Sequence, residues 1–173
     1  LTDVTGVQTC ALPILGALTA GTLTAVYSLT ASLVRVAGGV VADRLGGERT
    51  AMLALTTTLV GALSLSLFSG INWSITGMML MALGMGISNA AVFKLMPLFV
   101  PQAVGGAAGW IGGLGAFGGF AIPPLMGLMV SNLGVAGYAA GFWVYVCLAL
   151  LSMGMTLYLQ HSRRVVQAAV ADR

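Results

Sequence analysis

Five long apolar runs, separated by short polar joints, constrain this chain more than any other feature of its sequence. They cover residues near 15–41, 50–70, 73–99, 105–131 and 135–160. A helix needs about 20 predominantly apolar residues to cross the hydrocarbon core of a bilayer, so each run is long enough to span a membrane. Glycine or proline punctuates every joint, as helix ends usually require. We therefore expect an all-α integral membrane protein with five transmembrane helices.

The composition excludes a soluble domain and offers no site for catalysis. Only 6% of the residues are charged and 58% are apolar, whereas about a quarter of the residues of a soluble protein are charged. The chain has no paired carboxylates and no cysteine–histidine pair, and its one histidine, His161, lies beside the basic residues after the last run. Cys10 and Cys147 are too few and too far apart for a metal site, and Cys147 is expected to pack as a small apolar residue. We expect no enzyme, no metal, no cofactor and, without a basic stripe, no nucleic-acid partner.

The two ends of the chain need separate treatment. Residues 4–14 read VTGVQTCALPI, which matches the translation of a common sequencing-library adapter; the alternative is a native loop that leads into a helix. We expect residues 1–14 to be an artefact, the native chain to begin upstream of Leu15, and the present chain to be a fragment. Residues 161–173 are expected to form a polar cytoplasmic tail.

Basic residues indicate the orientation of the runs. Alternating spans bring one set of basic residues to a single side of the membrane: Arg44, Arg49, Lys94, Arg163 and Arg164. The joints on the opposite side, near Gly70 and Asn132, carry no charge. Because lysine and arginine favour the cytoplasmic side, we expect a multi-pass protein of the cell inner (plasma) membrane with a cytoplasmic C-terminus.

Arg35 is the one cation deep within an apolar run. It precedes Asp43 by eight residues, about 12 Å of helical rise, so it lies closer to the bilayer midplane than to the surface. An unpaired arginine there costs at least about 2.5 kcal/mol, and no acid lies in any expected span. The planar guanidinium suits a planar oxyanion, so we expect a buried arginine that binds an anion. The alternative is that the side chain snorkels to the surface, which explains Lys94 better; a role for Lys94 in attracting anions or in coupling stays open.

The sequence GGVVADRLGGERT at residues 38–50 resembles the loop motif of the major facilitator superfamily. The resemblance implies a partial C-terminal bundle, spans 8–12 of a twelve-helix fold, whose missing N-terminal half is a partner of this one. It also implies a gating role for the loop residues, with a solvated turn as the alternative. Those residues are Gly38, Gly39, Asp43, Arg44, Gly46 and Gly47.

Two further segments resemble the nitrate/nitrite porter family within that superfamily. They are AAGWIGGLGAFGGFAIPPLMG at residues 107–127 and GISNAAVFKLMP at residues 86–97. The resemblance implies transport of nitrate or nitrite by alternating access, with Arg35 supplying half of the charge recognition and an arginine of the absent second span the rest. Ser88 and Asn89 are polar within their span and are expected to hydrogen-bond either the substrate or a neighbouring helix. The candidate substrate-binding residues are Arg35, Ser88, Asn89, Phe93, Gly109, Gly112 and Gly115.

Three other functions remain open from the residues. A carrier of a small organic anion would also need Arg35. A proton-coupled exporter usually places a carboxylate in the membrane, and the expected spans contain none. A helical membrane scaffold would tolerate the loss of Arg35. Under the nitrate/nitrite interpretation, the expected partners are a small inorganic anion and the lipid bilayer.

Overall fold

The computed structural model describes residues 17–68, 70–134 and 136–171. These residues form five α-helices and no β-strand: α2 (Ala17–Leu45), α3 (Gly47–Leu67), α4 (Ile71–Phe99), α5 (Val104–Leu133) and α6 (Ala136–Ala171). Each helix is apolar and long enough to cross a membrane, which confirms the expected all-α membrane protein. Residues 1–14, which were expected to be an artefact and include Cys10, lie outside the described residues, as do the last two residues.

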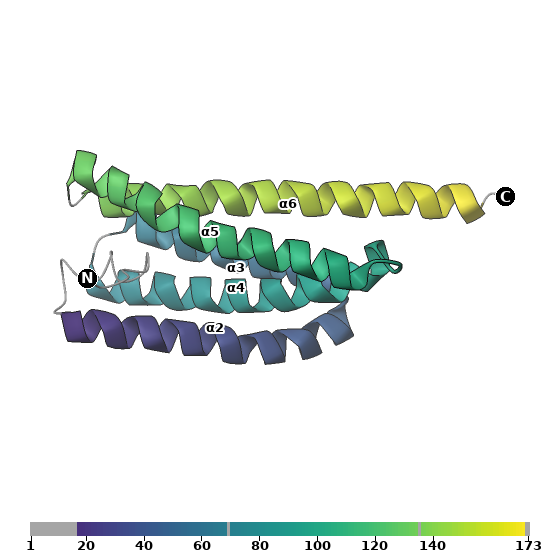
Figure 1. The fold of residues 1–173 in the computed structure, drawn as a ribbon, viewed down its shortest axis with the longest axis horizontal. Helices are drawn as coiled ribbons and strands as arrows, with labels where there is room; N and C mark the ends of the chain where they lie inside the picture. Colours follow the sequence, from purple (N-terminus) through teal and green to yellow (C-terminus); the bar gives the residue numbers. More distant parts are fainter. Residues whose placement is uncertain (1–16, 69, 135, 172–173) are drawn as a thin grey trace.

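The helices run up and down through a single elongated bundle (Figure 1). α2, α4 and α6 run in one direction, and α3 and α5 return in the other. The C-terminal ends of α2, α4 and α6 therefore lie toward the same end of the bundle, with α6 extending beyond its neighbours. This arrangement agrees with the alternation expected from the basic residues, since the helix ends that carry them point the same way.

α3 and α4 form the tightest helix pair, and α2 and α6 pack onto it from different sides. A Cβ atom at Gly61 of α3 would lie 2.8 Å from both the carbonyl oxygen of Gly77 and the amide nitrogen of Met81 in α4. Only glycine allows the two backbones to approach so closely. The adjoining core combines methionine, aliphatic and aromatic side chains: Ala62, Leu65, Met78, Met81, Met126, Phe142 and Val146.

α5 is the least embedded helix of the bundle. It packs mainly against α6 and only weakly against α4, and Met126 is its one buried residue. A Cβ atom built at Gly109, Gly112 or Gly113 would meet nothing within 4 Å. The glycine-rich face of α5 therefore has no packing partner among the described residues.

Two helix boundaries differ from the sequence-based expectation. The charged joint at residues 42–49 is helical on both sides of Gly46, whose φ of +87° ends α2 in a conformation that suits glycine. α6 continues to Ala171 instead of ending near residue 160, because the residues that follow include good helix formers such as alanine, glutamine and arginine. Between α3 and α4, at the uncharged end of the bundle, the ring of Phe68 stacks on that of Trp73 with ring centroids 4.8 Å apart.

Candidate functional site

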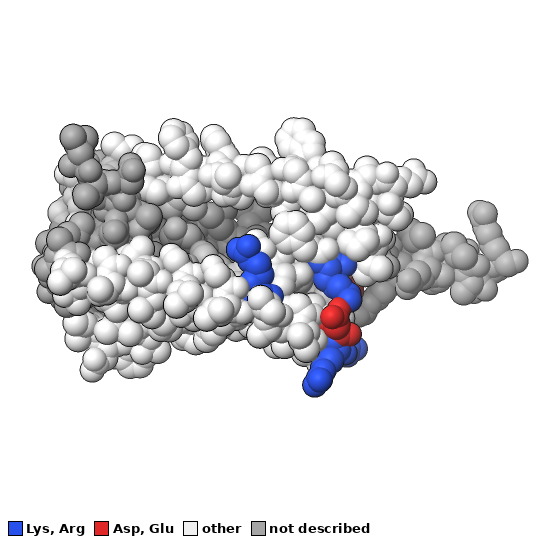
Figure 2. All heavy atoms as spheres, turned by 60° about the horizontal axis from the view of Figure 1, so that its bottom comes forward, with Lys and Arg blue, Asp and Glu red and all other residues white. Residues whose placement is uncertain are grey.

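An ion pair joins α2 to α4 near the basic end of the bundle. The Lys94 ammonium donates to the Asp43 carboxylate, and the two side chains are 46% and 61% exposed. Figure 2 shows a red acidic patch flanked by blue basic side chains, with further blue atoms along the same face. Sequence reasoning missed this pairing because it treated Lys94 as a snorkelling side chain and Asp43 as part of a loop.

Arg35 lies on α2, and its side chain is exposed rather than buried. The described helices therefore do not bury the guanidinium. The physical reason is that α2 contacts the other helices along only one side. Only 11% of its most apolar 18-residue segment is buried. The guanidinium is consequently open to a ligand or to another part of the protein on this face.

Glycine contacts fix the depth of Arg35 relative to α4. A Cβ atom at Gly38 would lie 2.9 Å from the Cα atom of Ile87, and one at Gly86 would contact the backbone of Ala31. Residues 31–38 of α2 therefore run alongside residues 86–90 of α4, which puts Arg35 at the level of Asn89. The Oδ1 atom of Asn89 is buried and accepts no hydrogen bond from any residue that the structure describes.

The remaining residues of the α2–α4 seam divide between exposed and packed positions. Phe93, which precedes Lys94, is 42% exposed, and Arg44 is exposed in the last turn of α2. A Cβ atom at Gly47 would lie 2.8 Å from Leu95 Cδ2, whereas one at Gly39 would meet nothing within 4 Å. The loop motif thus contains glycines that pack closely against α4 and glycines that do not.

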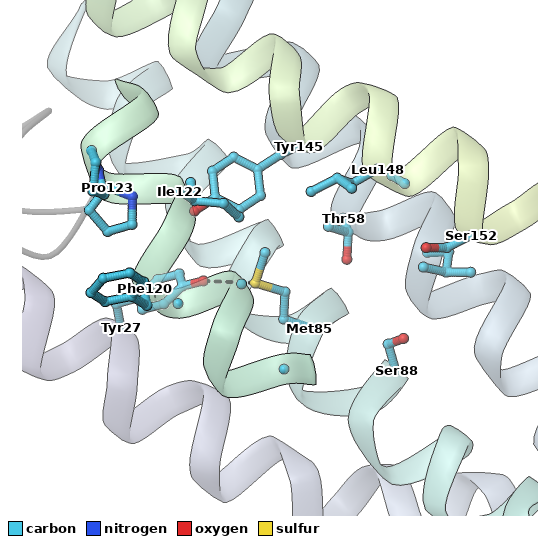
Figure 3. A pocket seen from close by; sticks show the side chains of 16 residues that line it. Tyr27, Thr58, Met85, Ser88, Phe120, Ile122, Pro123, Tyr145, Leu148 and Ser152 are labelled. Carbon is cyan, nitrogen blue, oxygen red and sulfur yellow. Dashed lines mark hydrogen bonds between the residues drawn. The ribbon is translucent and has the colours of Figure 1, made fainter. Parts of the chain in front are cut away.

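A cavity of about 770 Å³ is lined by residues from all five described helices, among them Tyr27 of α2 and Thr58 of α3. Ser88 and Gly115 both line it, and Figure 3 shows the Ser88 side chain turned toward it together with Thr58 and Ser152. In the same view the Tyr27 hydroxyl donates to Met85 Sδ at 3.1 Å. No charged residue lines this cavity, so its lining suits apolar groups far better than a bare anion.

A second cavity of about 360 Å³ extends toward the basic end. It shares Leu55, Ser88 and Ser152 with the first cavity and reaches Glu48. The two spaces therefore adjoin one another along α3, α4 and α6. Neither is lined by Arg35, Asn89 or Phe93.

The structure thus separates the candidate residues into two groups. Arg35 on α2 and Asn89 and Phe93 on α4 line neither described cavity, whereas Ser88 and Gly115 line the 770 Å³ cavity. Gly109 and Gly112 line neither described cavity and lie on the open face of α5. Sequence reasoning missed Tyr27 and Ser152 in the cavity, since an isolated hydroxyl in an apolar run gives no signal that distinguishes it from packing.

Nothing in the described part of the chain could hold a metal ion, because its histidine, cysteine and acidic side chains form no cluster of three or more. Cys147 lies within the candidate span of α6, as expected, and is a free thiol that the described helices leave exposed.

Five spanning helices, joined by short turns and carrying their basic residues at one end, define a multi-pass membrane protein. The model of the Major Facilitator Superfamily matches residues 6–172. The chain belongs to this superfamily, which confirms the resemblance of its loop motif and supports the expectation that it is not an enzyme.

Comparison with curated proteins gives relatives with a more specific name. The chain is 29% identical over 136 residues to Probable nitrate transporter NarT of Staphylococcus aureus strains bovine RF122 / ET3-1, JH9 and Newman. Each alignment covers 78% of this chain and 35% of the relative, so the chain spans about a third of the relatives' length. No solved structure matches.

Proposed function

We propose that residues 15–173 form the C-terminal part of a carrier that moves nitrate or nitrite across the inner membrane by alternating access. The similarity to proteins named as nitrate transporters is the observation that carries this proposal. Residues 17–171 would be spans 8–12 of a twelve-helix carrier, with the C-terminus in the cytoplasm. A carrier of this kind binds its substrate near the bilayer midplane between two bundles.

The exposed face of α2 and α4 supplies the chemistry that such a carrier needs. Arg35 presents a guanidinium that the described helices leave exposed, and Asn89 lies at a similar level on α4. Guanidinium offers paired N–H donors in one plane, which match two oxygens of a planar anion. The uncharged 770 Å³ cavity lacks such a donor. We therefore assign the anion to the α2–α4 seam and not to the larger cavity.

Substitution of Arg35 by lysine tests this function. Arg35→Lys keeps the charge but loses the planar pair of donors, so we expect the apparent KM for nitrate to rise at least about tenfold. The measurement is nitrate uptake by the full-length protein in cells that lack their own nitrate carriers. Arg49→Lys is the matched control, because Arg49 lies on α3 at the basic end, away from the level of Arg35.

Two results would contradict the proposal. Unchanged KM and rate in Arg35→Lys would show that Arg35 does not bind the anion. Uptake of a small organic anion but not of nitrate by the wild type would replace nitrate with that substrate class.

A further inference from the structure

The Lys94–Asp43 ion pair is a charged contact between helices in the described part of the chain, and no role has yet been given for it. It joins α4 to the last turn of α2, where the carboxylate of Asp43 meets the negative end of the helix dipole. A carboxylate at the C-terminal end of a helix is electrostatically unfavourable unless a cation lies nearby. A nearby cation therefore stabilises the charged form of Asp43, and Lys94 is such a cation.

Holding α2 against α4 does not require this pair. Gly38 of α2 lies close to Ile87 of α4, and Gly86 of α4 lies close to the backbone of Ala31 in α2. Both charged side chains are about half exposed, and exposed ion pairs add little to stability. Backbone packing thus already holds α2 against α4, so we expect the Lys94–Asp43 ion pair to have a role other than stability.

The positions of three charged side chains indicate the role of the ion pair. Asp43, Arg35 and Lys94 are all exposed on α2 and α4, and Asp43 lies two helical turns from Arg35, about 12 Å along the axis. Phe93 is exposed beside Lys94. An anion that travels between the basic end and Arg35 along this face passes the Asp43 carboxylate, whose charge opposes it unless a cation neutralises it.

We propose that Lys94 is a positioning residue for anion recognition: it neutralises Asp43, so that the face leading to Arg35 does not repel the substrate. The inference rests on the proposed function, because it presupposes an anion as cargo. Lys94 need not touch the anion in the bound state. Lys94 acts instead by raising the electrostatic potential along the face of α2 and α4 that leads to Arg35.

A charge cycle in the full-length protein tests this inference. Lys94→Met removes the cation that pairs with Asp43, and the apparent KM for nitrate should rise about three- to tenfold with a smaller change in kcat. Asp43→Asn should lower KM or leave it unchanged, whatever the turnover rate loses through the gating role expected of this loop. The double variant Asp43→Asn/Lys94→Met should return KM to within about twofold of the wild type, since neither charge remains. Lys94→Arg should keep the wild-type KM.

Salt and a matched control separate this role from a structural one. Raised ionic strength should shrink the effect of Lys94→Met, because salt screens exposed charges beyond about 10 Å. Arg49→Gln removes a cation from the same end of the bundle without releasing Asp43, and its KM should stay within about twofold of the wild type. A merely structural pair would instead lower the amount of folded protein in every variant that loses a charge, with KM unaltered.

Each outcome decides one question. An unchanged KM in Lys94→Met, or a double variant as impaired as Lys94→Met, overturns the inference while the wild type still transports nitrate. Absence of nitrate uptake by the wild type overturns the proposed function, and the inference falls with it.

Discussion

Asn89 presents a polar atom that the described helices leave unsatisfied. Its Oδ1 is buried without a hydrogen-bond partner there, and a buried unpaired acceptor is costly. The oxygen and nitrogen of an asparagine amide are distinguished only by their hydrogen bonds. Rotation of the amide would place an N–H donor at the same point. That donor lies at the depth of Arg35 and suits an anion.

Replacement of Asn89 by aspartate tests this interpretation. Asn89→Asp keeps the shape of the side chain but removes the donor and adds a negative charge. We expect the apparent KM for nitrate to rise at least about tenfold, since a like charge opposes the substrate directly. Uptake by the full-length protein is the measurement, and Asn72→Asp at the uncharged end is a control of equal chemistry. Equal KM values in both variants would make Asn89 a packing residue.

At the scale of the helix, glycines play two different parts. Those of α3 and α4 allow backbone contact, as at Gly61, where a Cβ atom would lie 2.8 Å from two backbone atoms of α4. Those of α5 face open space. The sequence does not distinguish the two kinds, because both occur at the same three- or four-residue spacing.

A pair of alanine substitutions compares these two kinds of glycine. Gly61→Ala should destabilise the protein by about 1–3 kcal/mol, because α3 and α4 must move apart. Gly113→Ala should be neutral or stabilising by up to about 1 kcal/mol, because alanine is the better helix former and nothing lies within 4 Å. Thermal unfolding in detergent measures both. Equal losses of stability would mean that α5 packs as closely as α3.

Helix positions followed from the sequence, whereas contacts between helices did not. Apolar run length and glycine punctuation predict α2–α6 to within a few residues, except that α6 extends into the expected tail. The exposed state of Arg35 could not be predicted, because hydropathy says how deep a residue lies but not which side of its helix meets a neighbour. The Lys94–Asp43 pair escaped prediction for a related reason, since its residues are 51 positions apart.

The bundle as a whole has a direction that can be measured. The helix ends that carry basic residues point to one end, and the opposite turns carry no charge. A fluorescent protein fused after Arg173 should fold and fluoresce in the cytoplasm, because lysine and arginine favour that side. A reporter that is active only outside the cytoplasm should work when it is inserted near Gly70. The reverse pattern would invert the topology.

The five helices should not transport by themselves. The seam that carries Arg35 and the glycine-rich face of α5 are both open in the described chain, and a substrate site between two bundles is incomplete when one is absent. Liposomes that contain only residues 17–171 should take up no more nitrate than empty ones, whereas the full-length protein should exceed them clearly. Uptake by the short chain would move the whole site into these helices.

The open face of α5 also bears on how long such a chain lasts in a cell. A helix side made of glycine has few side-chain atoms with which to pack against a neighbour, and glycine gains the most freedom when a helix opens. Segments with few buried contacts open first. A membrane protease that acts on locally opened helices would therefore begin at α5, and the covering of this one face would set the lifetime of the whole chain.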